Sequence, residues 1–450
     1  MAKTTHEFRD AIHSFITCST DERKVINSRP MQRLRHIHHL AMTYLLYPGA
    51  THRRFEHSLG VMHLATRMFD TLTDPENLRH LDSNVRSLID EHIGSDRQKN
   101  HWKTVVRMGA LCHDVGHLPF SHGAEELLPE GISHETLTWK IITGPHMAEL
   151  WRSLSISEPE EIAKVAVGAK EASRMNPPKI LSPWEDLMAE IVVGNAFGAD
   201  RMDYLLRDSL HTGVAYGKFD VDRLIKTLRF LPQPPEGEGG ESDNPVIGVE
   251  LGGLHAAESM LWARYFMFSQ VYFHPVRKIY DLHLQEFMKA EFSRGIPLDD
   301  GLEQFLKLTD NEVLASLRKA AYDPLSPGHD PARRIEKREH FKKFFELTFS
   351  ERQSNPLALQ EVAEAARTKW GKENIRVFDK DKSAGTVQFP VRRDDGKSIP
   401  AQAQSPAIKN LPVVTTGYIF INPQSHMEAR KWIAENRGSL VKDLNQGEAS

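Results

Sequence analysis

The residues best suited to chemistry are an adjacent histidine and aspartate, His113 and Asp114, which follow an apolar run at residues 105 to 112. An imidazole beside a carboxylate offers a divalent metal ion two ligands of intermediate and hard character from adjacent backbone positions. His57 lies upstream and Asp200 lies downstream, each in its own predicted helix. We expect these four residues to form a metal site at the centre of a helical domain. The alternative is a buried polar network that holds the helices together.

Two of the helices that must position this set are well marked in the sequence. Residues 55 to 73 have the apolar spacing of an amphipathic helix. Residues 184 to 209 are also predicted to be helical. Within this stretch Asp200, Tyr204 and Asp208 are four residues apart and share one helix face. A face of two carboxylates and a phenol is unusual for a purely structural helix, which favours a functional role.

The overall composition is that of an ordinary globular protein, with 40% hydrophobic and 26% charged residues. A formal net charge of -4 gives no global indication of nucleic-acid binding. Two cysteines, Cys18 and Cys112, argue against a disulfide scaffold. No apolar run is long enough for a membrane span, and the N-terminus lacks the apolar core of a signal peptide. The sequence therefore predicts a cytoplasmic protein.

The rest of the chain is predicted to change character near residue 370, from helices to short alternating stretches. Residues 6 to 20 carry apolar side chains at helical spacing and are predicted to form a short helix. A long helix is expected over residues 254 to 292, with a bend near His274-Pro275. The other predictions are helices at 301–320, 333–348 and 424–436, and strands at 246–251, 374–378, 385–391 and 413–422.

Five stretches carry a family resemblance, and a sixth is looser. They are residues 30–35, 47–61, 112–122, 133–135 and 200–208, with the looser match at 264–281. In this order they resemble the HD-domain phosphohydrolases and, among these, the deoxynucleoside triphosphate triphosphohydrolases. The resemblance implies a mainly α fold, an HD-domain helical core with a small α+β C-terminal region. The predicted regions are a catalytic core (1–230), a helical continuation that completes the nucleotide pocket (246–350) and the C-terminal region (370–450).

The resemblance also implies roles for particular residues. A divalent ion (Mg, Mn, Fe, Zn, Ni or Co) would be held by His57, His113, Asp114 and Asp200. His134, oriented by Glu125, would act near the scissile bond, and His117 would face the phosphates; positioning of phosphate alone is the alternative for His134. Arg33, Arg35 and Arg53 are expected at the surface or at an interface. The expected substrate-binding residues are Arg54, His122, Arg201, Tyr204, Asp208, Arg264, Tyr272 and His39.

Some positions depart from the family pattern. His39 replaces a glutamine that helps to recognise deoxyribose, and Asn27 stands where a relative uses aspartate to read guanine at a regulatory site. His274-Pro275 replaces a His-Lys step, which removes one phosphate-binding charge. Glu125 stands where family members often have aspartate. The sugar and base preference and a guanine-nucleotide activator are therefore not carried over from the family to this chain.

The expected activity is metal-dependent hydrolysis of a deoxynucleoside triphosphate to deoxynucleoside and tripolyphosphate. The resemblance implies a role in nucleotide-pool control or in phage defence by nucleotide depletion. It also implies a homo-oligomer and a possible nucleotide activator. One alternative is an HD phosphohydrolase for another nucleotide, such as an alarmone, a dinucleoside polyphosphate or a nucleic-acid end. Another is a nucleotide-sensing oligomer in which catalysis is secondary.

Overall fold

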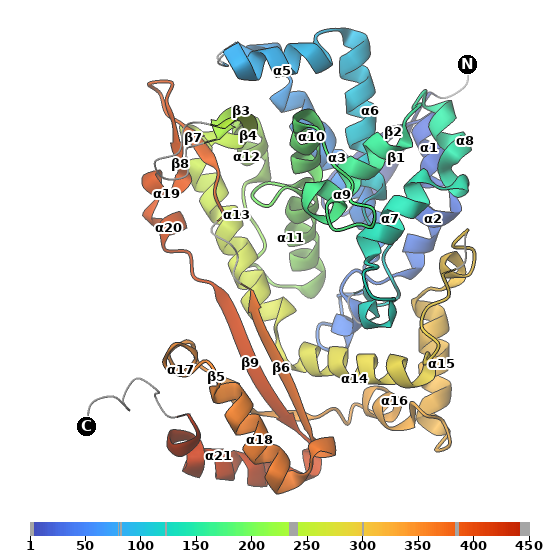
Figure 1. Cartoon of the computed structure of the whole chain (residues 1–450), viewed down its shortest axis with the longest axis vertical. Coiled ribbons are helices and arrows are strands. Elements are labelled where there is room, and N and C mark those ends of the chain that lie inside the picture. Colours follow the sequence, from blue (N-terminus) through green and yellow to red (C-terminus); the bar gives the residue numbers. More distant parts are fainter. Residues whose placement is uncertain are drawn as a thin grey trace. The chain divides into compact units, whose positions relative to one another are not determined.

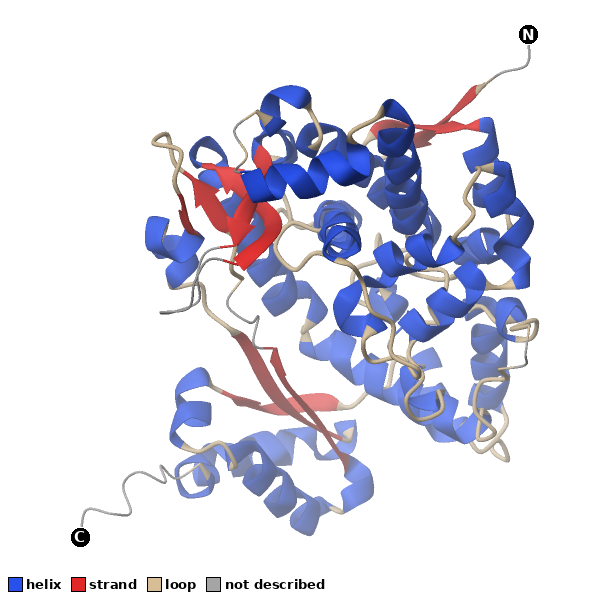
Figure 2. Ribbon diagram, turned by 45° about the horizontal axis from the view of Figure 1, so that its top comes forward, coloured by secondary structure: helices blue, strands red, loops and turns tan. Residues whose placement is uncertain are grey.

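The computed structural model describes residues 4–79, 81, 83–121, 124–233, 242–298, 301–382 and 387–441. Helices dominate these residues, and the strands form small sheets (Figures 1 and 2). The predicted mainly α fold is confirmed. Within the described residues, no helix is both long enough and apolar enough to cross a membrane.

The chain divides into two compact units whose segments alternate along the sequence. Unit 1 comprises Met1–Arg264, Ile296–Asn311 and Val387–Leu411, and unit 2 comprises Tyr265–Gly295, Glu312–Thr386 and Pro412–Ser450. The sequence-predicted region 370–450 therefore has residues in both units. The division into regions 1–230, 246–350 and 370–450 stays a prediction.

Unit 1 is built around packed helices that carry the site. The central helices are α3 (Arg54–Leu72), α6 (Asp96–Cys112), α9 (Pro159–Ala172), α10 (Pro183–Val193) and α11 (Ala199–Thr212). The other helices are α1 (Thr20–Ile26), α2 (Arg29–Arg33), α4 (Pro75–Leu78), α5 (Ser83–Ile93), α7 (His134–Thr143), α8 (Pro145–Ser153), α12 (Val221–Thr227), α19 (Ala401–Gln404) and α20 (Pro406–Lys409).

Helices α3 and α11 approach each other closely because α3 has a glycine at the contact. A Cβ atom on Gly60 would lie 1.9 Å from Oδ1 of Asp203 and 2.5 Å from Nη2 of Arg207. Helix α6 is capped at its N-terminus by Ser95, whose hydroxyl accepts a hydrogen bond from the Gln98 amide, and His113 is its C-cap residue. The missing side chain at Gly60 thus lets α3 and α11 bring His57 and Asp200 close together.

The N-terminal segment is a β-hairpin, so the helix predicted over residues 6 to 20 is wrong. Strand β1 (Thr5–Asp10) pairs antiparallel with β2 (Ser14–Ser19). Oδ1 of Asp10 accepts hydrogen bonds from the amides of Ile12 (2.8 Å) and His13 (2.9 Å), which stabilises the turn. Ser14 has a φ of 61°, which ends any helical course. The turn chemistry of Asp10 outweighs the helical spacing of the apolar residues.

A four-stranded sheet completes unit 1. Its strands are β3 (Leu228–Gln233), β4 (Ser242–Glu250), β7 (Pro390–Arg392) and β8 (Ser398–Pro400), in the order β3-β4-β7-β8. Strand β4 covers the strand predicted at residues 246–251 except for its last residue, Leu251, which begins a 3-10 helix. Strand β7 runs parallel to β4 and covers the end of the strand predicted at 385–391, of which residues 385 and 386 lie outside the described residues.

Unit 2 has its own apolar core around a three-stranded antiparallel sheet. The strands are β5 (Lys342–Leu347), β6 (Ile375–Lys382) and β9 (Val414–Ile421), in the order β5-β9-β6. Its helices are α14 (Pro275–Glu291), α16 (His329–Glu336), α17 (Phe349–Ser354), α18 (Ala358–Trp370) and α21 (His426–Leu440). Helices α13 (Leu254–Met267) and α15 (Asp310–Tyr322) have residues in both units.

Two predictions for this part of the chain have different outcomes. The predicted bend near His274-Pro275 is confirmed: α13 passes into a π-helical turn at Phe268–Tyr272, and α14 begins at Pro275. The helix predicted over residues 333–348 is wrong beyond residue 336, because β5 begins at Lys342. Antiparallel pairing with β9 satisfies the backbone of β5 and decides its conformation.

Candidate metal centre

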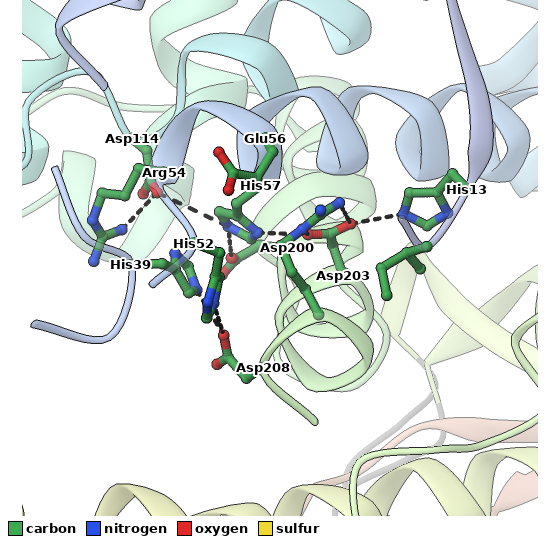
Figure 3. A network of polar contacts seen from close by, with 12 residues as sticks. His13, His39, His52, Arg54, Glu56, His57, Asp114, Asp200, Asp203 and Asp208 are labelled. Atoms are coloured by element: carbon green, nitrogen blue, oxygen red, sulfur yellow. Dashed lines mark hydrogen bonds and ion pairs between the residues drawn. The ribbon is translucent and has the colours of Figure 1, made fainter. Parts of the chain in front are cut away.

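Side chains from α3, from the end of α6 and from α11 converge in unit 1 (Figure 3). Nε2 of His57 lies 3.1 Å from Oδ1 of Asp200 and 3.9 Å from Oδ2 of Asp114. Nε2 of His113 lies 3.3 Å from Oδ1 of Asp114 and 3.6 Å from Oδ1 of Asp200. The structure thus brings together the four ligands proposed from the sequence.

The donor atoms of this cluster fit a divalent ion. Nδ1 of His113 donates to the Ala110 carbonyl at 2.8 Å, which leaves Nε2 with a lone pair directed into the cluster. That Nε2 atom is buried and has no hydrogen-bond partner among the described residues. Ligand atoms of His57, His113 and Asp200 lie within 4.8 Å of one another. Two imidazoles with carboxylates suit borderline and hard divalent ions.

A buried ionic network lies behind the metal cluster and orients His57. Asp203 accepts hydrogen bonds from Nδ1 of His57 (2.8 Å), Nε2 of His13 (2.7 Å) and Nε of Arg207 (2.8 Å). Arg207 also donates to Asp10 at 2.9 Å. We call Asp10, His13, Asp203 and Arg207 the buried ionic network. It holds Nδ1 of His57 and directs Nε2 toward the metal cluster.

Neighbouring charges and hydrogen bonds shift the pKa values of Asp203 and His57. Burial would raise the pKa of Asp203, but the Arg207 charge and the hydrogen bonds from His13 and His57 hold it well below its usual value. Burial opposes protonation of His57, but hydrogen bonds to Asp200 and Asp203 outweigh it and raise the pKa of His57 to about 10. The carboxylates around His57 therefore favour positive charge at its ring.

The residues proposed for acid–base chemistry lie on the other side of Asp114. Nε2 of His117 lies 3.2 Å from Oδ1 of Asp114, and the rings of His117 and His134 stack 4.0 Å apart. Nδ1 of His134 is 2.6 Å from Oε1 of Glu125. Burial opposes protonation of His134, but the hydrogen bond to Glu125 and the charge of Glu135 outweigh it and raise its pKa. Burial, Arg54 and His134 hold the pKa of His117 well below its usual value, so the pKa values of the two imidazoles shift in opposite directions.

Two arginines help to form this side of the site. Arg54 donates to Oδ2 of Asp114 at 2.6 Å and to Oγ of Ser121 at 2.6 Å. Arg33, predicted at the surface or at an interface, is instead buried and donates to the carbonyls of His117 (2.8 Å) and Leu308 (2.9 Å). That prediction is wrong because the guanidinium is needed to satisfy carbonyls of the loop that follows the His-Asp pair. The proposed ligand His122 lies outside the described residues.

The remaining proposed substrate residues occupy several places. Asp208 lies at the far end of the α11 face, 2.7 Å from Nε2 of His52 and 3.6 Å from Nε2 of His39. Burial raises the pKa of Tyr204, which lies between Asp200 and Asp208 on α11. Arg201 donates hydrogen bonds to the carbonyls of Val193 (2.7 Å) and Gly194 (2.6 Å). Arg264 donates a hydrogen bond to the Asn195 carbonyl (3.1 Å). Tyr272 belongs to unit 2, where its ring lies 4.9 Å from that of Phe268.

Sequence reasoning missed Asp310 as a supporting residue. Its fully buried carboxylate accepts hydrogen bonds from the backbone amide and Nδ1 of His38 (2.7 and 2.6 Å) and from the amide of Phe120 (2.7 Å). Asp310 thus joins the segment that carries His39 to the loop that carries Ser121. No local signal marks it, because its partners are 190 and 272 positions away.

The signal that could have found Asp203 and Arg207 is their spacing of four residues on a helix.

Comparisons with known proteins identify the family of this chain. The HD domain model matches residues 54–166, and the model of the HD associated region matches residues 219–375. Deoxynucleoside triphosphate triphosphohydrolase SAMHD1 of Gallus gallus is 30% identical and aligns with 74% of this chain and 55% of its own length. An uncharacterized protein of Methanocaldococcus jannaschii is 33% identical over 68% of this chain and 56% of its own length. The chain spans slightly more than half the length of these curated relatives.

A solved structure matches most of this chain. A hypothetical protein from Aquifex aeolicus has 32% sequence identity and a TM-score of 0.75, over 95% of this chain and 99% of that chain. The chain belongs to the HD-domain family, with an HD domain followed by an HD-associated region. It is homologous to the SAMHD1 deoxynucleoside triphosphate triphosphohydrolases and to uncharacterized HD proteins. The family resemblance predicted from the sequence is confirmed.

Proposed function

We propose that this protein is a metal-dependent phosphohydrolase that converts deoxynucleoside triphosphates to deoxynucleoside and tripolyphosphate. The observation that carries the proposal is the convergence of His57, His113, Asp114 and Asp200 beside Arg54 and the His134–Glu125 pair. Homology to the SAMHD1 triphosphohydrolases supports the choice of substrate class. A homo-oligomer, a nucleotide activator and a cytoplasmic location remain predictions from the sequence.

The metal site supplies the first part of the chemistry. When bound, a divalent ion neutralises phosphoryl charge and lowers the pKa of a coordinated water. The residues that would hold it are His57, His113, Asp114 and Asp200. Asp203 keeps the His57 ring in the orientation that directs Nε2 into the cluster.

The protein's own residues then bind the phosphates and move a proton. Arg54 is fixed by Asp114 and Ser121, so its planar guanidinium needs no reorganisation when it meets phosphate oxygens. His117 is neutral and can donate one hydrogen bond to a phosphate. Glu125 and Glu135 raise the pKa of His134 and so favour its protonated form, from which it delivers a proton to the leaving 5′-oxygen.

The direct test is hydrolysis of the four deoxynucleoside triphosphates, GTP and ATP with Mg²⁺, Mn²⁺ or Co²⁺ added. Ion-exchange chromatography separates tripolyphosphate from pyrophosphate and phosphate. We expect tripolyphosphate with wild type and none with Asp114→Ala. Release of pyrophosphate or phosphate would contradict cleavage of the bond between the α-phosphorus and the 5′-oxygen, while turnover itself would still support a phosphohydrolase.

A second candidate function is hydrolysis of another nucleotide, such as an alarmone or a dinucleoside polyphosphate. The observation that favours it is His39, which lies beside Asp208 where the family resemblance places a glutamine for deoxyribose. Absence of turnover for every deoxynucleoside triphosphate, including mixtures that could supply an activator, would select this candidate. The same chromatographic assay with those nucleotides tests it.

A further inference from the structure

Three side chains outside the proposed ligand set gather next to it. The backbone bridge between His38 and Arg53, together with the hydrogen bond from the His39 amide to the His52 carbonyl (3.0 Å), places His39 and His52 side by side. Their ring centroids are 5.3 Å apart. Asp208 approaches from α11, with Oδ1 2.7 Å from Nε2 of His52 and 3.6 Å from Nε2 of His39 (Figure 3).

This trio has the composition of a metal site. One ligand atom from each of His39, His52 and Asp208 lies within 4.8 Å of the others. Two imidazoles and one carboxylate form a donor set that binds transition metal ions in preference to Mg²⁺ or Ca²⁺. A bound ion of this kind would replace the proton that His52 and Asp208 share, and it would carry a higher charge than that proton.

The trio is also buried and only partly satisfied by the protein. The side chains of His39, His52 and Asp208 are 8%, 0% and 2% exposed. Nδ1 of His39 and Nδ1 of His52 are both buried without a hydrogen-bond partner among the described residues. Nε2 of each ring, and not Nδ1, is the atom that faces Asp208 and is available to an ion, and burial of these facing atoms strengthens their attraction for a cation.

We infer that His39, His52 and Asp208 form a second metal site, which takes a divalent transition ion such as Zn²⁺, Co²⁺, Mn²⁺ or Fe²⁺. It adjoins the first metal centre, because the rings of His39 and His57 are 4.3 Å apart. His39 also lies within 4.8 Å of ligand atoms of His57 and Asp114. His52 and Asp208 are therefore the residues that belong to the second site alone, and they are the ones to change.

The test counts metal ions in the full-length protein and does not need turnover. The protein is stripped with a chelator, reloaded with Co²⁺, passed through a desalting column and analysed by mass spectrometry of the metal. We expect two ions per chain in wild type and one in His52→Gln. His211→Gln is the matched control, because its ring stacks on His52 at 4.3 Å but is not part of the trio, and it should keep two ions.

A second measurement reports whether the two ions are neighbours. In the protein loaded with Mn²⁺, we expect dipolar coupling in the electron paramagnetic resonance spectrum of wild type and of His211→Gln. The coupling should vanish in His52→Gln. Asp208→Asn, which keeps the side-chain shape, replaces His52→Gln if that variant fails to fold by circular dichroism.

One ion per chain in wild type overturns the second site, and so do two ions in both His52→Gln and Asp208→Asn. Either result leaves the proposed hydrolysis open, since that activity is measured separately on the same preparations. Conversely, two ions in a protein that hydrolyses no deoxynucleoside triphosphate would support the second site and count against the proposed substrate.

Discussion

Both compact units bury apolar side chains, but among the described residues only unit 1 also buries charged ones. In unit 1 the buried residues include the charged groups Asp203, Arg207 and Asp310, each at most 1% exposed. In unit 2 the three-stranded sheet buries an apolar cluster against α18 and α21, with Ile419 and Val362 at 0%. The first arrangement positions ligands, and the second stabilises its own fold.

This difference follows from the cost of removing charges from water. Burying an ion pair costs desolvation energy that the mutual attraction of the charges offsets only when the geometry is good. Burying aliphatic carbon is favourable by about 25 cal/mol per Å². We therefore expect unit 1 to be sensitive to loss of any charged partner and unit 2 to loss of volume. Five changes, from the largest expected effect to the smallest, test this comparison.

Removal of a metal ligand should have the largest effect on activity. We expect Asp200→Ala to lower kcat/KM for the best substrate by at least about a thousand-fold, because the ion supplies several kcal/mol of charge stabilisation. Metal content per chain should fall as well. Asp222→Ala, which removes an exposed carboxylate paired with Arg67, is the control and should keep full activity. Normal turnover by Asp200→Ala would exclude it as a ligand.

Breaking the buried ionic network should have the largest effect on stability. Arg207→Met leaves Asp203 and Asp10 without their cation in a buried place, which costs about 3–5 kcal/mol. Urea unfolding followed by circular dichroism measures the change. If the loss is below about 1 kcal/mol, water reaches these carboxylates and the contrast with unit 2 is smaller than the structure indicates.

Loss of volume in the unit 2 core should reduce stability without touching the metal centre. Ile419→Ala removes a fully buried side chain of β9, at a cost of about 2–5 kcal/mol. Amide hydrogen exchange should accelerate in β5, β6 and β9, while α3 and α11 keep their protection. Metal content should stay at the wild-type value; a lower value would show that the two units are coupled.

The pH dependence of stability should distinguish two glutamates of α10. Burial raises the pKa of Glu190 to about 7, above its value in the unfolded chain. The stability that its neutral form contributes is fully present below the unfolded pKa of 4.5 and is lost as pH rises through about 7. Glu190→Gln should therefore match wild type near pH 4 and be more stable by about 2–3 kcal/mol at pH 9.

Glu185 on the same helix is the matched control with the opposite sign. Burial opposes its ionisation, but Lys164 and the Ser182 amide and hydroxyl outweigh this and lower its pKa. The stability that ionised Glu185 contributes to the fold is present above its pKa in the unfolded chain and is lost as pH falls. Glu185→Gln should therefore be less stable than wild type at neutral pH. Thermal unfolding at a series of pH values measures both variants. Parallel pH profiles for the two would contradict the assignment.

The smallest effect should come from an exposed ion pair of unit 1. Arg86 and Asp90 are paired at 2.8 Å on α5, and about half of each side chain is in contact with solvent. Arg86→Ala should change stability by no more than about 0.5 kcal/mol, because solvent screens the pair. Comparison with Arg207→Met, measured by the same urea titration, separates the effect of burial from that of charge.

Much of the fold was predictable because local patterns carry it. The amphipathic spacing of residues 55 to 73 agrees with α3, and Pro275 marks the start of α14. Where local signals conflict, the prediction failed. Residues 6 to 20 have helical apolar spacing, but the Asp10 side chain organises a hairpin turn. Residues 342–347 form a strand because β9, far along the chain, is available to pair with them.

The sequence by itself determined which residue types could bind a metal and that they lie on separate helices, since neighbouring positions and helical spacing decide both. Only the tertiary structure decided which partners hold them. Asp203 orients His57 across 146 positions and meets His13 across 190. Asp208 turns toward His52 and His39 rather than toward the first metal centre. These choices depend on how helices pack, and the energy of each buried charge depends on partners that no local pattern contains.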